Sequence, residues 1–334
     1  MTAPFLAISD LAVGFSREGR FARVIPGLSY SVQRGETLGI VGESGSGKSV
    51  HALALLGLLP QPPGRVLGGQ ALFDGEDLLA LPETRLRDLR GGRIGVVFQD
   101  PMTALNPVLT VGRQISEPLT RHKGMTARQA WDRAGDLLAL VGIRDGVRRL
   151  SQFPHEFSGG MRQRVMIAIA IACEPALLIA DEPTTALDVT VQGQILDLMA
   201  GLRERLGMTM VWITHDMGVV AGIADTIQVM YAGRIMERGP VSAVFADPRS
   251  AYTWGLLQSL PHGARPPGGR LQQIPGQPPD MFALPPGDPF APRNRFATPR
   301  CHVEAPPLRQ AENSVPGHMV AAWYDLPSLL AKAA

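Results

Sequence analysis

One glycine-rich segment constrains the fold of this chain more than any other feature. Residues 42–49 read Gly-Glu-Ser-Gly-Ser-Gly-Lys-Ser and match the spacing G-x-x-x-x-G-K-[ST]. The apolar run from Leu38 to Val41 predicts a buried strand before this segment, and the stretch from Val50 to Leu59 predicts a helix after it. A strand, a glycine-rich loop and a helix in this order predict an α/β core with a phosphate-binding loop.

The residue types of this segment suit a bound polyphosphate. Glycines let successive backbone N–H groups turn toward phosphate oxygens, and the start of the following helix adds a favourable dipole. Lys48 would reach the β- and γ-phosphates, and Ser49 would ligate Mg²⁺. The alternative, a glycine-rich surface turn, is disfavoured by the flanking strand and helix. The predicted nucleotide-binding residues are Gly42, Glu43, Ser44, Gly45, Ser46, Gly47, Lys48, Ser49 and Val50.

Two carboxylates follow another apolar run and form a second candidate site. Leu177 to Ala180 predict a strand, and Asp181 and Glu182 come directly after it. Ligands of open α/β sheets bind at the carboxyl ends of the strands. Asp181 would hold Mg²⁺, directly or through water, and Glu182 would orient or deprotonate an attacking water. A solvated pair that opens a loop is the alternative, and the phosphate-binding loop on the same chain disfavours it.

A third candidate lies at a predicted helix start. Ser158, Gly159, Gly160 and Met161 precede the apolar stretch from Val165 to Cys173. Such a start is either an anion site or an ordinary serine N-cap with a glycine turn. The residues by themselves favour neither interpretation.

Composition bounds the class of protein. The 334 residues are 45% hydrophobic and 19% charged, which is enough apolar material for one or two domains. The balance of 32 basic and 30 acidic residues leaves a net charge of +2, which argues against binding nucleic acid through bulk charge. Only Cys173 and Cys301 are present, so a disulfide scaffold is excluded, and neither has zinc-site spacing.

No membrane or secretion segment is expected. Met1 to Asp10 lack a basic segment followed by an apolar run, so we expect no secretion signal. The longest uninterrupted apolar run, Val165 to Cys173, is far shorter than the roughly 20 residues that span a bilayer. Any membrane association is therefore expected to occur through a partner.

Proline and glycine mark a boundary near Leu260. Residues 261–300 hold 11 prolines and 5 glycines, which disfavours long helices and central strands there. We therefore predict a domain at 1–260 and an extension at 261–334. Within the first, strand-like and helix-like stretches alternate, which is typical of a mainly parallel sheet covered by helices. Residues 1–36 differ, because short runs broken by Gly14, Gly19 and Gly27 predict an antiparallel meander.

Taken together, these segments resemble the ATP-binding subunits of ABC transporters. Residues 99–107, 156–164 and 184–192 are similar to the dipeptide/oligopeptide/nickel uptake branch, and residues 274–279 and 289–293 are similar to its C-terminal extension. The segments that share the order and spacing of the wider family are the phosphate-binding loop, Gln99 after the predicted strand from Ile94 to Phe98, Ser158 to Met161, Asp181 with Glu182, Ala186-Leu187-Asp188, and His215.

The resemblance implies a fold and a set of residue roles. The fold would be a P-loop NTPase core with an N-terminal antiparallel β subdomain, an inserted α-helical subdomain at about residues 102–172 and a Pro-rich C-terminal extension. The catalytic residues would be Glu182, His215 and Gln99, with His215 and Gln99 sensing the γ-phosphate. The Mg²⁺ ligands would be Ser49, Gln99 and Asp181. Ser158, Gly159, Gly160 and Met161 would bind ATP held by the opposite subunit, and Asp188 would shape the dimer seam.

An aromatic side chain is expected to stack on adenine about 30 residues before the phosphate-binding loop. Phe15 fits this position best, and Phe21 is a competitor. The resemblance also implies an ATPase that powers a bacterial importer of di- or oligopeptides or of a related small solute, a nickel chelate being the alternative.

The implied partners are a second, non-identical ATP-binding subunit, two transmembrane permease subunits and an extracytoplasmic solute-binding protein. The chain would lie on the cytoplasmic face of the bacterial inner membrane as a peripheral subunit. The rival class is an ABC-type ATPase that acts on nucleic acid or ribosomes. A single phosphate-binding loop, no sustained heptads and no cysteine pairs argue against that class.

The expected cofactors are ATP and Mg²⁺, without an iron–sulfur cluster. Many relatives carry four cysteines in the extension that bind such a cluster. Alignment on residues 289–293 places Asp288, Asn294, Cys301 and Ala322 at those positions, so a single thiolate remains.

Overall fold

The computed structural model describes residues 3–185, 187–260 and 273–333 of the chain. They divide into two compact units, each of which combines segments distant in sequence. Unit 1 comprises Met1–Val32, Thr37–Leu79 and Thr214–Ala334, and unit 2 comprises Gln33–Glu36 and Ala80–Ile213. Ala186, part of one family-like segment, and residues 261–272, the start of the predicted extension, lie outside the described residues.

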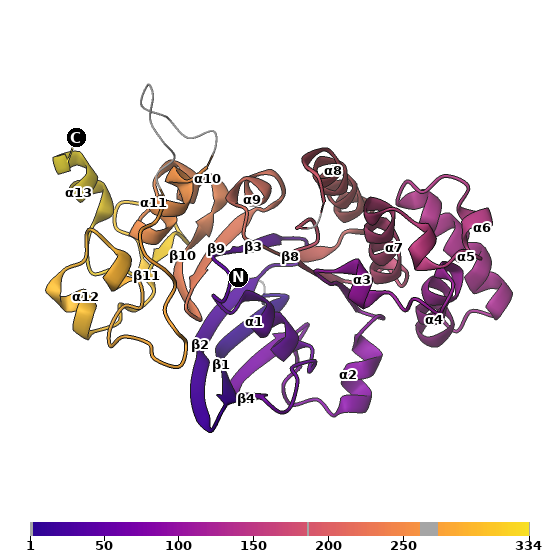
Figure 1. Cartoon of the computed structure of the whole chain (residues 1–334), viewed down its shortest axis with the longest axis horizontal. Coiled ribbons are helices and arrows are strands. Elements are labelled where there is room, and N and C mark those ends of the chain that lie inside the picture. Colours follow the sequence, from indigo (N-terminus) through magenta and orange to yellow (C-terminus); the bar gives the residue numbers. More distant parts are fainter. Residues whose placement is uncertain (1–2, 186, 261–272, 334) are drawn as a thin grey trace. The chain divides into compact units, whose positions relative to one another are not determined.

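An antiparallel sheet forms the N-terminal part of unit 1. The long strands β1 (Leu6–Arg17) and β2 (Arg20–Val32) make a hairpin, and β1 also pairs with β4 (Gly64–Phe73). The short strand β5 (Glu76–Asp77) pairs with β4, which gives the order β2-β1-β4-β5. Figure 1 shows β2, β1 and β4 side by side. The predicted antiparallel arrangement is therefore confirmed, but the strands are longer than the short runs expected from the sequence.

The strands are longer than expected because Gly14 and Gly27 do not interrupt them. Both are inside strands and do not break them. A Cβ atom on Gly14 would lie 2.2 Å from Cζ of Phe21, so a side chain at this position would require the Phe21 ring to move. Gly14 thus permits a ring from the neighbouring strand to cross over β1, which is a recurrent use of glycine within strands.

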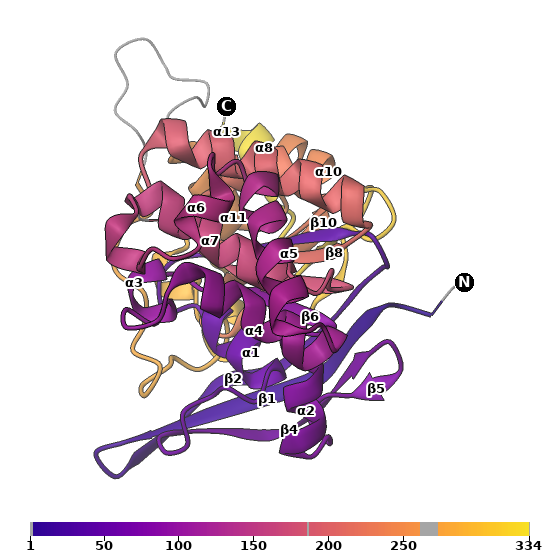
Figure 2. The same cartoon turned by 90° about the vertical axis from the view of Figure 1, so that its right-hand side faces the viewer.

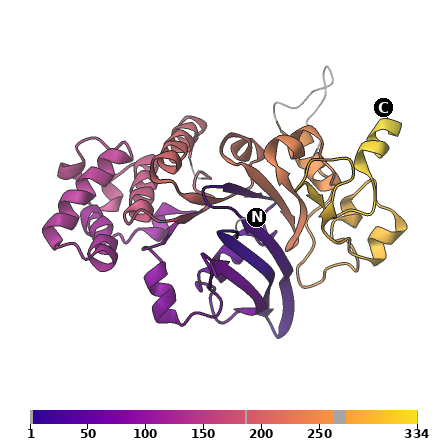
Figure 3. The same ribbon diagram turned by 180° about the vertical axis from the view of Figure 1, so that it is seen from behind.

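The remaining strands of unit 1 form a second set, in which some neighbours are parallel and others antiparallel. The strand β3 (Thr37–Val41) pairs in parallel with β9 (Thr226–Tyr231), and β9 pairs antiparallel with β10 (Arg234–Pro240). The edge of β10 is covered by β12 (Met319–Val320), which in turn pairs with β11 (Arg309–Gln310). Figure 3 shows this yellow C-terminal segment beside the orange strands of the same unit.

The C-terminal extension also contributes to the core of unit 1. Phe290 and Leu326 are buried in one cluster with Val41, Tyr231 and Tyr252. The helices of this unit are α1 (Lys48–Leu55), α9 (Met217–Ile223), α10 (Val241–Ala246), α11 (Ala251–Gln258), η2 (Ala291–Arg293), α12 (Pro299–Val303) and α13 (Leu326–Ala333).

A buried carboxylate ties the extension to β10. Glu237 has no exposed surface, and its two oxygens accept the backbone N–H groups of Arg249 at 2.7 Å and Ser250 at 2.9 Å. Nε2 of His318, from the extension, lies 2.7 Å from the same carboxylate and donates to it. A buried charge requires such partners, so β10 and the extension depend on each other.

Unit 2 combines a parallel set of strands with a group of helices. β6 (Ile94–Val97) pairs with β7 (Leu177–Asp181), and β7 pairs with β8 (Thr209–Thr214), all in parallel. Figure 2 shows α4, α5 and α7 next to one another. The helices of this unit are α2 (Glu83–Leu89), α3 (Pro101–Ala104), α4 (Val111–Lys123), α5 (Ala127–Leu140), α6 (Gly146–Arg149), η1 (Pro154–Glu156), α7 (Gly159–Ile171) and α8 (Val189–Leu206).

The two units confirm the predicted α/β class with an antiparallel N-terminal sheet and a helical insertion. The division at residues 260 and 261 stays a prediction. Among the helices of the described residues, none has the length and apolar content needed to cross a bilayer.

His51, on α1 just after the phosphate-binding loop, makes the stability of unit 1 sensitive to acid. Its Nδ1 donates to the carbonyl of Lys48 at 2.9 Å, so its Nε2 accepts from the Tyr30 hydroxyl at 2.5 Å. Complete burial lowers the pKa of His51 to about 4.

We expect acid to weaken the native state through His51. Between pH 6.5 and about 4 the unfolded chain binds a proton on His51 that the native state excludes, so the free energy of unfolding falls by up to about 3 kcal/mol as the pH falls. Urea unfolding of the wild-type protein and His51→Gln at pH 7, 5.5 and 4.5 measures this, with a shallower pH dependence expected for the variant. Equal pH dependence in both proteins would contradict the assignment.

Candidate nucleotide site

The glycine-rich loop joins β3 to α1 within unit 1, as the sequence predicts. A Cβ atom on Gly42 would lie 2.1 Å from the carbonyl oxygen of Met230, so this position admits only glycine. Gly47 has a φ of 95° at the start of α1, a conformation that favours glycine. Gly45 also has a positive φ, of 79°, so the spacing of the glycines reflects one close backbone approach and two left-handed residues.

Lys48 lies across this loop and not toward bulk water. Its side chain is buried, and Nζ donates to the carbonyl oxygens of Gly42 at 2.8 Å and Glu43 at 3.0 Å. Ser49 and Val50 follow in the first turn of α1, so the N-terminus of this helix faces the loop. A buried ammonium group beside a helix N-terminus is a suitable arrangement for phosphate oxygens.

The carboxylates predicted at the end of β7 are held within unit 2. Asp181 is the last residue of the strand, and Glu182 follows with a positive φ of 46°. Oε2 of Glu182 accepts hydrogen bonds from Nε2 of Gln99 at 3.1 Å and from the hydroxyl of Thr185 at 2.8 Å. Two predicted catalytic residues are thus brought together. A strained backbone at a carboxylate is typical of a functional position.

Thr185 was not among the predicted site residues, although it lies in a segment similar to the transporter branch. Its hydroxyl fixes the carboxylate of Glu182 from the loop after β7. A threonine three residues beyond a candidate base carries no signal by itself, because local hydrogen bonds of this kind are common in loops.

Ser158 begins α7 as an N-cap, with Oγ accepting from the backbone N–H of Met161 at 3.4 Å. Asp188 caps α8 in the same way, accepting from Val191 at 2.9 Å. A Cβ atom on Gly160 would lie 2.9 Å from the side chain of Val191, so the two helix starts are neighbours within unit 2. The capping role does not exclude anion binding, because a serine hydroxyl that accepts one bond can still donate its hydrogen.

His215 and Phe15 lie in unit 1. His215 is exposed and follows the end of β8, directly before Asp216, the N-cap of α9. Phe15 is half-buried on β1. Phe21, its competitor for adenine stacking, lies on β2 with the guanidinium of Arg65 only 4.9 Å from its ring centroid. Which of the two rings stacks on adenine stays a prediction.

The positions aligned with cluster-binding cysteines are buried and engaged in backbone hydrogen bonds. Asp288 accepts from the N–H of Phe290 at 2.9 Å, and Asn294 accepts from that of Phe296 at 2.9 Å. Burial raises the pKa of Asp288. Sγ of Cys301 lies 3.4 Å from the N–H of Thr298. The polar atoms at these positions make hydrogen bonds in the turns of the extension. They do not fit an iron–sulfur cluster, because such a cluster is ligated by thiolates and only Cys301 offers one.

Two family models match the chain. The ABC transporter model matches residues 25–185, and the model of the oligopeptide/dipeptide transporter C-terminal region matches residues 236–301. The oligopeptide transport ATP-binding protein OppD of Bacillus subtilis (strain 168) is 49% identical over 318 residues, which cover 95% of this chain and 88% of that protein. A protein of Brucella abortus (strain 2308) named putative peptide import ATP-binding protein is 51% identical over 300 residues, 90% of each chain.

Solved structures agree with this likeness. The dimeric ATP-binding cassette MJ0796 in a post-hydrolysis state with ADP and phosphate has a TM-score of 0.64 and 27% sequence identity, and covers 71% of this chain and 98% of its own. The cbiO1 protein of Clostridium perfringens has a TM-score of 0.62 and 28% identity, and covers 73% of this chain and 92% of its own.

The fold and the loop define an ATPase of the ATP-binding cassette class. The chain belongs to the ABC transporter family, among the ATP-binding subunits that carry the oligopeptide/dipeptide transporter C-terminal region. The resemblance drawn from the motifs is confirmed.

Proposed function

We propose that this chain hydrolyses ATP to power the uptake of di- or oligopeptides by a bacterial ABC importer. The observation that supports this most strongly is continuous similarity, over 95% of the chain, to an oligopeptide transport ATP-binding protein. The oligopeptide/dipeptide transporter model matches residues 236–301, which include the first part of the extension.

The proposed chemistry assigns each site residue a role toward Mg·ATP. The N–H groups of residues 42–50 and the ammonium of Lys48 bind the phosphates, and Phe15 stacks on adenine. Ser49, Asp181 and Gln99 offer hydroxyl, carboxylate and amide oxygens, the donors that suit Mg²⁺. The ion, when bound, would neutralise charge on the phosphates.

Glu182 would act as the general base for hydrolysis, and His215 would contact the γ-phosphate. The hydrogen bonds of Glu182 with Gln99 and Thr185 both hold Oε2 of its carboxylate. Fixed orientation of a base lowers the cost of reaching the transition state. Gln99 would couple the γ-phosphate to the orientation of this base.

We propose that the working unit contains two ATP-binding subunits. Ser158, Gly159, Gly160 and Met161 would bind the γ-phosphate of ATP held by the partner, and Asp188 would shape the seam between the subunits. The partner would be a related, non-identical chain. Closure of the pair over ATP would switch two transmembrane permease subunits between their inward and outward states.

The proposed location is the cytoplasmic face of the bacterial cell membrane, with the chain attached to the permease subunits. A separate extracytoplasmic binding protein would select the solute. No nucleic acid would take part, in keeping with the net charge of +2.

Uptake of labelled peptides tests the proposed substrate class. Cells that lack this chain should lose uptake of radiolabelled di- and tetrapeptides, and the wild-type chain should restore it. Glu182→Gln, expressed at the same level, is the matched control and should not restore uptake. Loss of nickel uptake with normal peptide uptake would instead assign the chain to nickel chelates.

We also propose that the extension holds no iron–sulfur cluster, because only Cys301 among the four aligned positions is a thiol. Protein purified without oxygen should contain far less than one iron or sulfide per chain and show no charge-transfer absorption. Stoichiometric iron and sulfide, with absorption lost in Cys301→Ser, would overturn this.

A further inference from the structure

Arg293, in the C-terminal extension, makes a two-armed ion pair with the phosphate-binding loop. Nη1 lies 2.6 Å from Oε2 of Glu43, and Nη2 lies 3.0 Å from Oε1. The side chain of Arg293 is only 7% exposed and that of Glu43 only 24%. Paired hydrogen bonds between guanidinium and carboxylate are geometrically specific and stronger than neutral ones.

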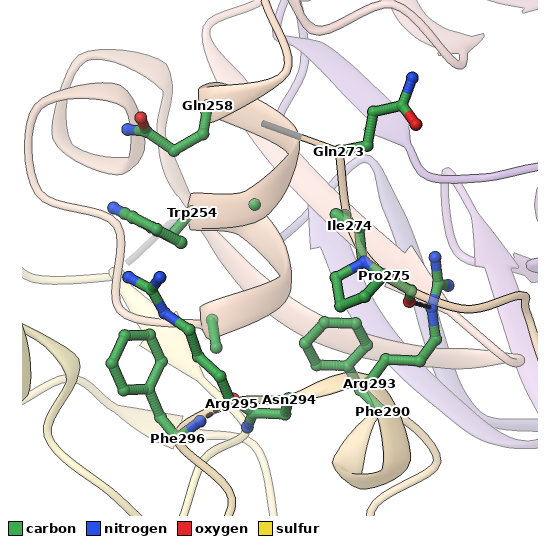
Figure 4. A pocket seen from close by; sticks show the side chains of 12 residues that line it. Trp254, Gln258, Gln273, Ile274, Pro275, Phe290, Arg293, Asn294, Arg295 and Phe296 are labelled. Atoms are coloured by element: carbon green, nitrogen blue, oxygen red, sulfur yellow. Dashed lines mark hydrogen bonds between the residues drawn. The ribbon is translucent and has the colours of Figure 1, made fainter. Parts of the chain in front are cut away.

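The arginine is itself anchored from several sides within unit 1. Its Nε donates to the carbonyl oxygen of Pro275 at 2.8 Å, and Nη1 also donates to the hydroxyl of Tyr231 at 3.1 Å. The guanidinium carbon lies 5.7 Å from the ring centroid of Tyr231 and 5.9 Å from that of Phe290. Figure 4 shows Arg293 beside Pro275 and Phe290. Four donor bonds and two rings thus fix its position.

Glu43 connects this anchor to the residue that would bind the phosphates. Its carbonyl oxygen accepts from Nζ of Lys48 at 3.0 Å, and its N–H donates to the hydroxyl of Tyr252 at 2.8 Å. Tyr252 and Tyr231 are in ring contact, with centroids 4.7 Å apart. The side chain and the backbone of Glu43 are therefore both held by the cluster that Arg293 completes.

We propose that Arg293 is a positioning residue for ATP binding, which holds Glu43 so that the phosphate-binding loop and Lys48 are preset before ATP arrives. This role rests on the proposed function of the same loop. The extension would thereby act on the nucleotide site of its own chain.

Charge gives Arg293 a second effect. Burial acts to lower the pKa of Arg293, but hydrogen bonds to Glu43 and Tyr231 outweigh it and raise the pKa, so the guanidinium stays charged. Its charge offsets the carboxylate of Glu43 at a loop that must accept a polyanion. Without the arginine, that carboxylate would repel the phosphates through a partly buried, weakly screened environment.

Arg293→Met is expected to weaken binding of Mg·ATP to the full chain by about ten-fold, and Arg293→Lys by a smaller factor, because lysine keeps the charge but not the paired geometry. Isothermal calorimetry measures the affinity. In steady-state hydrolysis KM should rise by a similar factor with little change in kcat. Mere misfolding of part of the sample would lower kcat and leave KM unchanged.

Two further variants make this test specific. In a Glu43→Gln background, Arg293→Met should weaken Mg·ATP binding by less than about three-fold, because this background has no Glu43 charge for the substitution to leave unpaired. Arg295→Met is the matched control, since Arg295 stacks on Trp254 and Phe296 at 4.5 and 4.6 Å in the same segment. Arg295→Met should change the affinity for Mg·ATP by less than about two-fold from that of the wild-type chain. The same loss in both Glu43 backgrounds, or a wild-type affinity in Arg293→Met, would overturn the proposal.

Hydrogen exchange separates this proposal from the proposed function. Without nucleotide, the amides of residues 42–47 should exchange faster in Arg293→Met than in the wild-type chain or in Arg295→Met. A wild-type chain that failed to bind Mg·ATP would refute the proposed function, whereas unchanged exchange at these amides would refute the role of Arg293. If Arg293→Met does not fold, Arg293→Lys and the double variant with Glu43→Gln decide the outcome by the same measurements.

Discussion

Glutamine in place of Glu182 is expected to slow ATP hydrolysis by roughly 10²–10⁴-fold while leaving the affinity for ATP nearly unchanged. Glutamine keeps the shape of the side chain and can still accept one hydrogen bond from Gln99 or Thr185, but it cannot take a proton from water. Phosphate release by the chain together with the proposed partner subunit, and nucleotide affinity of the purified full chain, would separate the two effects.

Lys48→Ala is the contrasting variant. Loss of the ammonium removes positive charge from the phosphates in both the ground state and the transition state, so affinity and turnover should fall together. Near-normal turnover in Glu182→Gln would refute the role of Glu182 as the base. Unchanged affinity in Lys48→Ala would refute phosphate binding by Lys48.

Arginine in place of Ser158 is expected to prevent the ATP-dependent pairing of two subunits while the chain still binds ATP at its own loop. A long cation at an exposed helix start would occupy the space where the partner's γ-phosphate is proposed to sit. Size-exclusion chromatography with ATP, in a Glu182→Gln background that retains nucleotide, measures the pairing with the proposed partner chain.

Thr126→Arg is a matched control for the lost helix cap. Thr126 is also an exposed N-cap, and its hydroxyl accepts from the backbone N–H of Gln129 at 3.3 Å. Both substitutions should cost about 1 kcal/mol of helix stability, but only Ser158→Arg should abolish pairing. Normal pairing of the Ser158→Arg protein would show that this helix start does not face a partner's nucleotide.

The sequence predicted well those features that depend on local pattern. Apolar runs of four or five residues located the strands β3, β6 and β7, because a buried parallel strand has few polar interruptions. The glycine spacing located the loop, because each glycine there meets a local backbone requirement. Gly14 misled the prediction, since whether a glycine ends a strand or admits a neighbouring ring depends on the residue across the sheet.

Long-range pairs were beyond the reach of the sequence. Glu43 and Arg293 both lie in recognised segments, but 250 positions separate them and no periodicity connects them. The pairing of Tyr30 with His51 and that of Glu237 with His318 are similar cases. Each depends on which elements pack together, and a single sequence does not specify that packing directly.

The pairing of β12 with β10 limits how the extension can be studied by deletion. Removing residues after 260 would strip the cover from an edge strand, expose a row of unpaired backbone groups and invite aggregation. It would also leave the Glu237 carboxylate without its imidazole and open the aromatic cluster around Phe290. A truncated chain would therefore report on damage to the nucleotide-binding unit itself. Single substitutions on the exposed side of the extension are the cleaner way to ask what it contributes to transport.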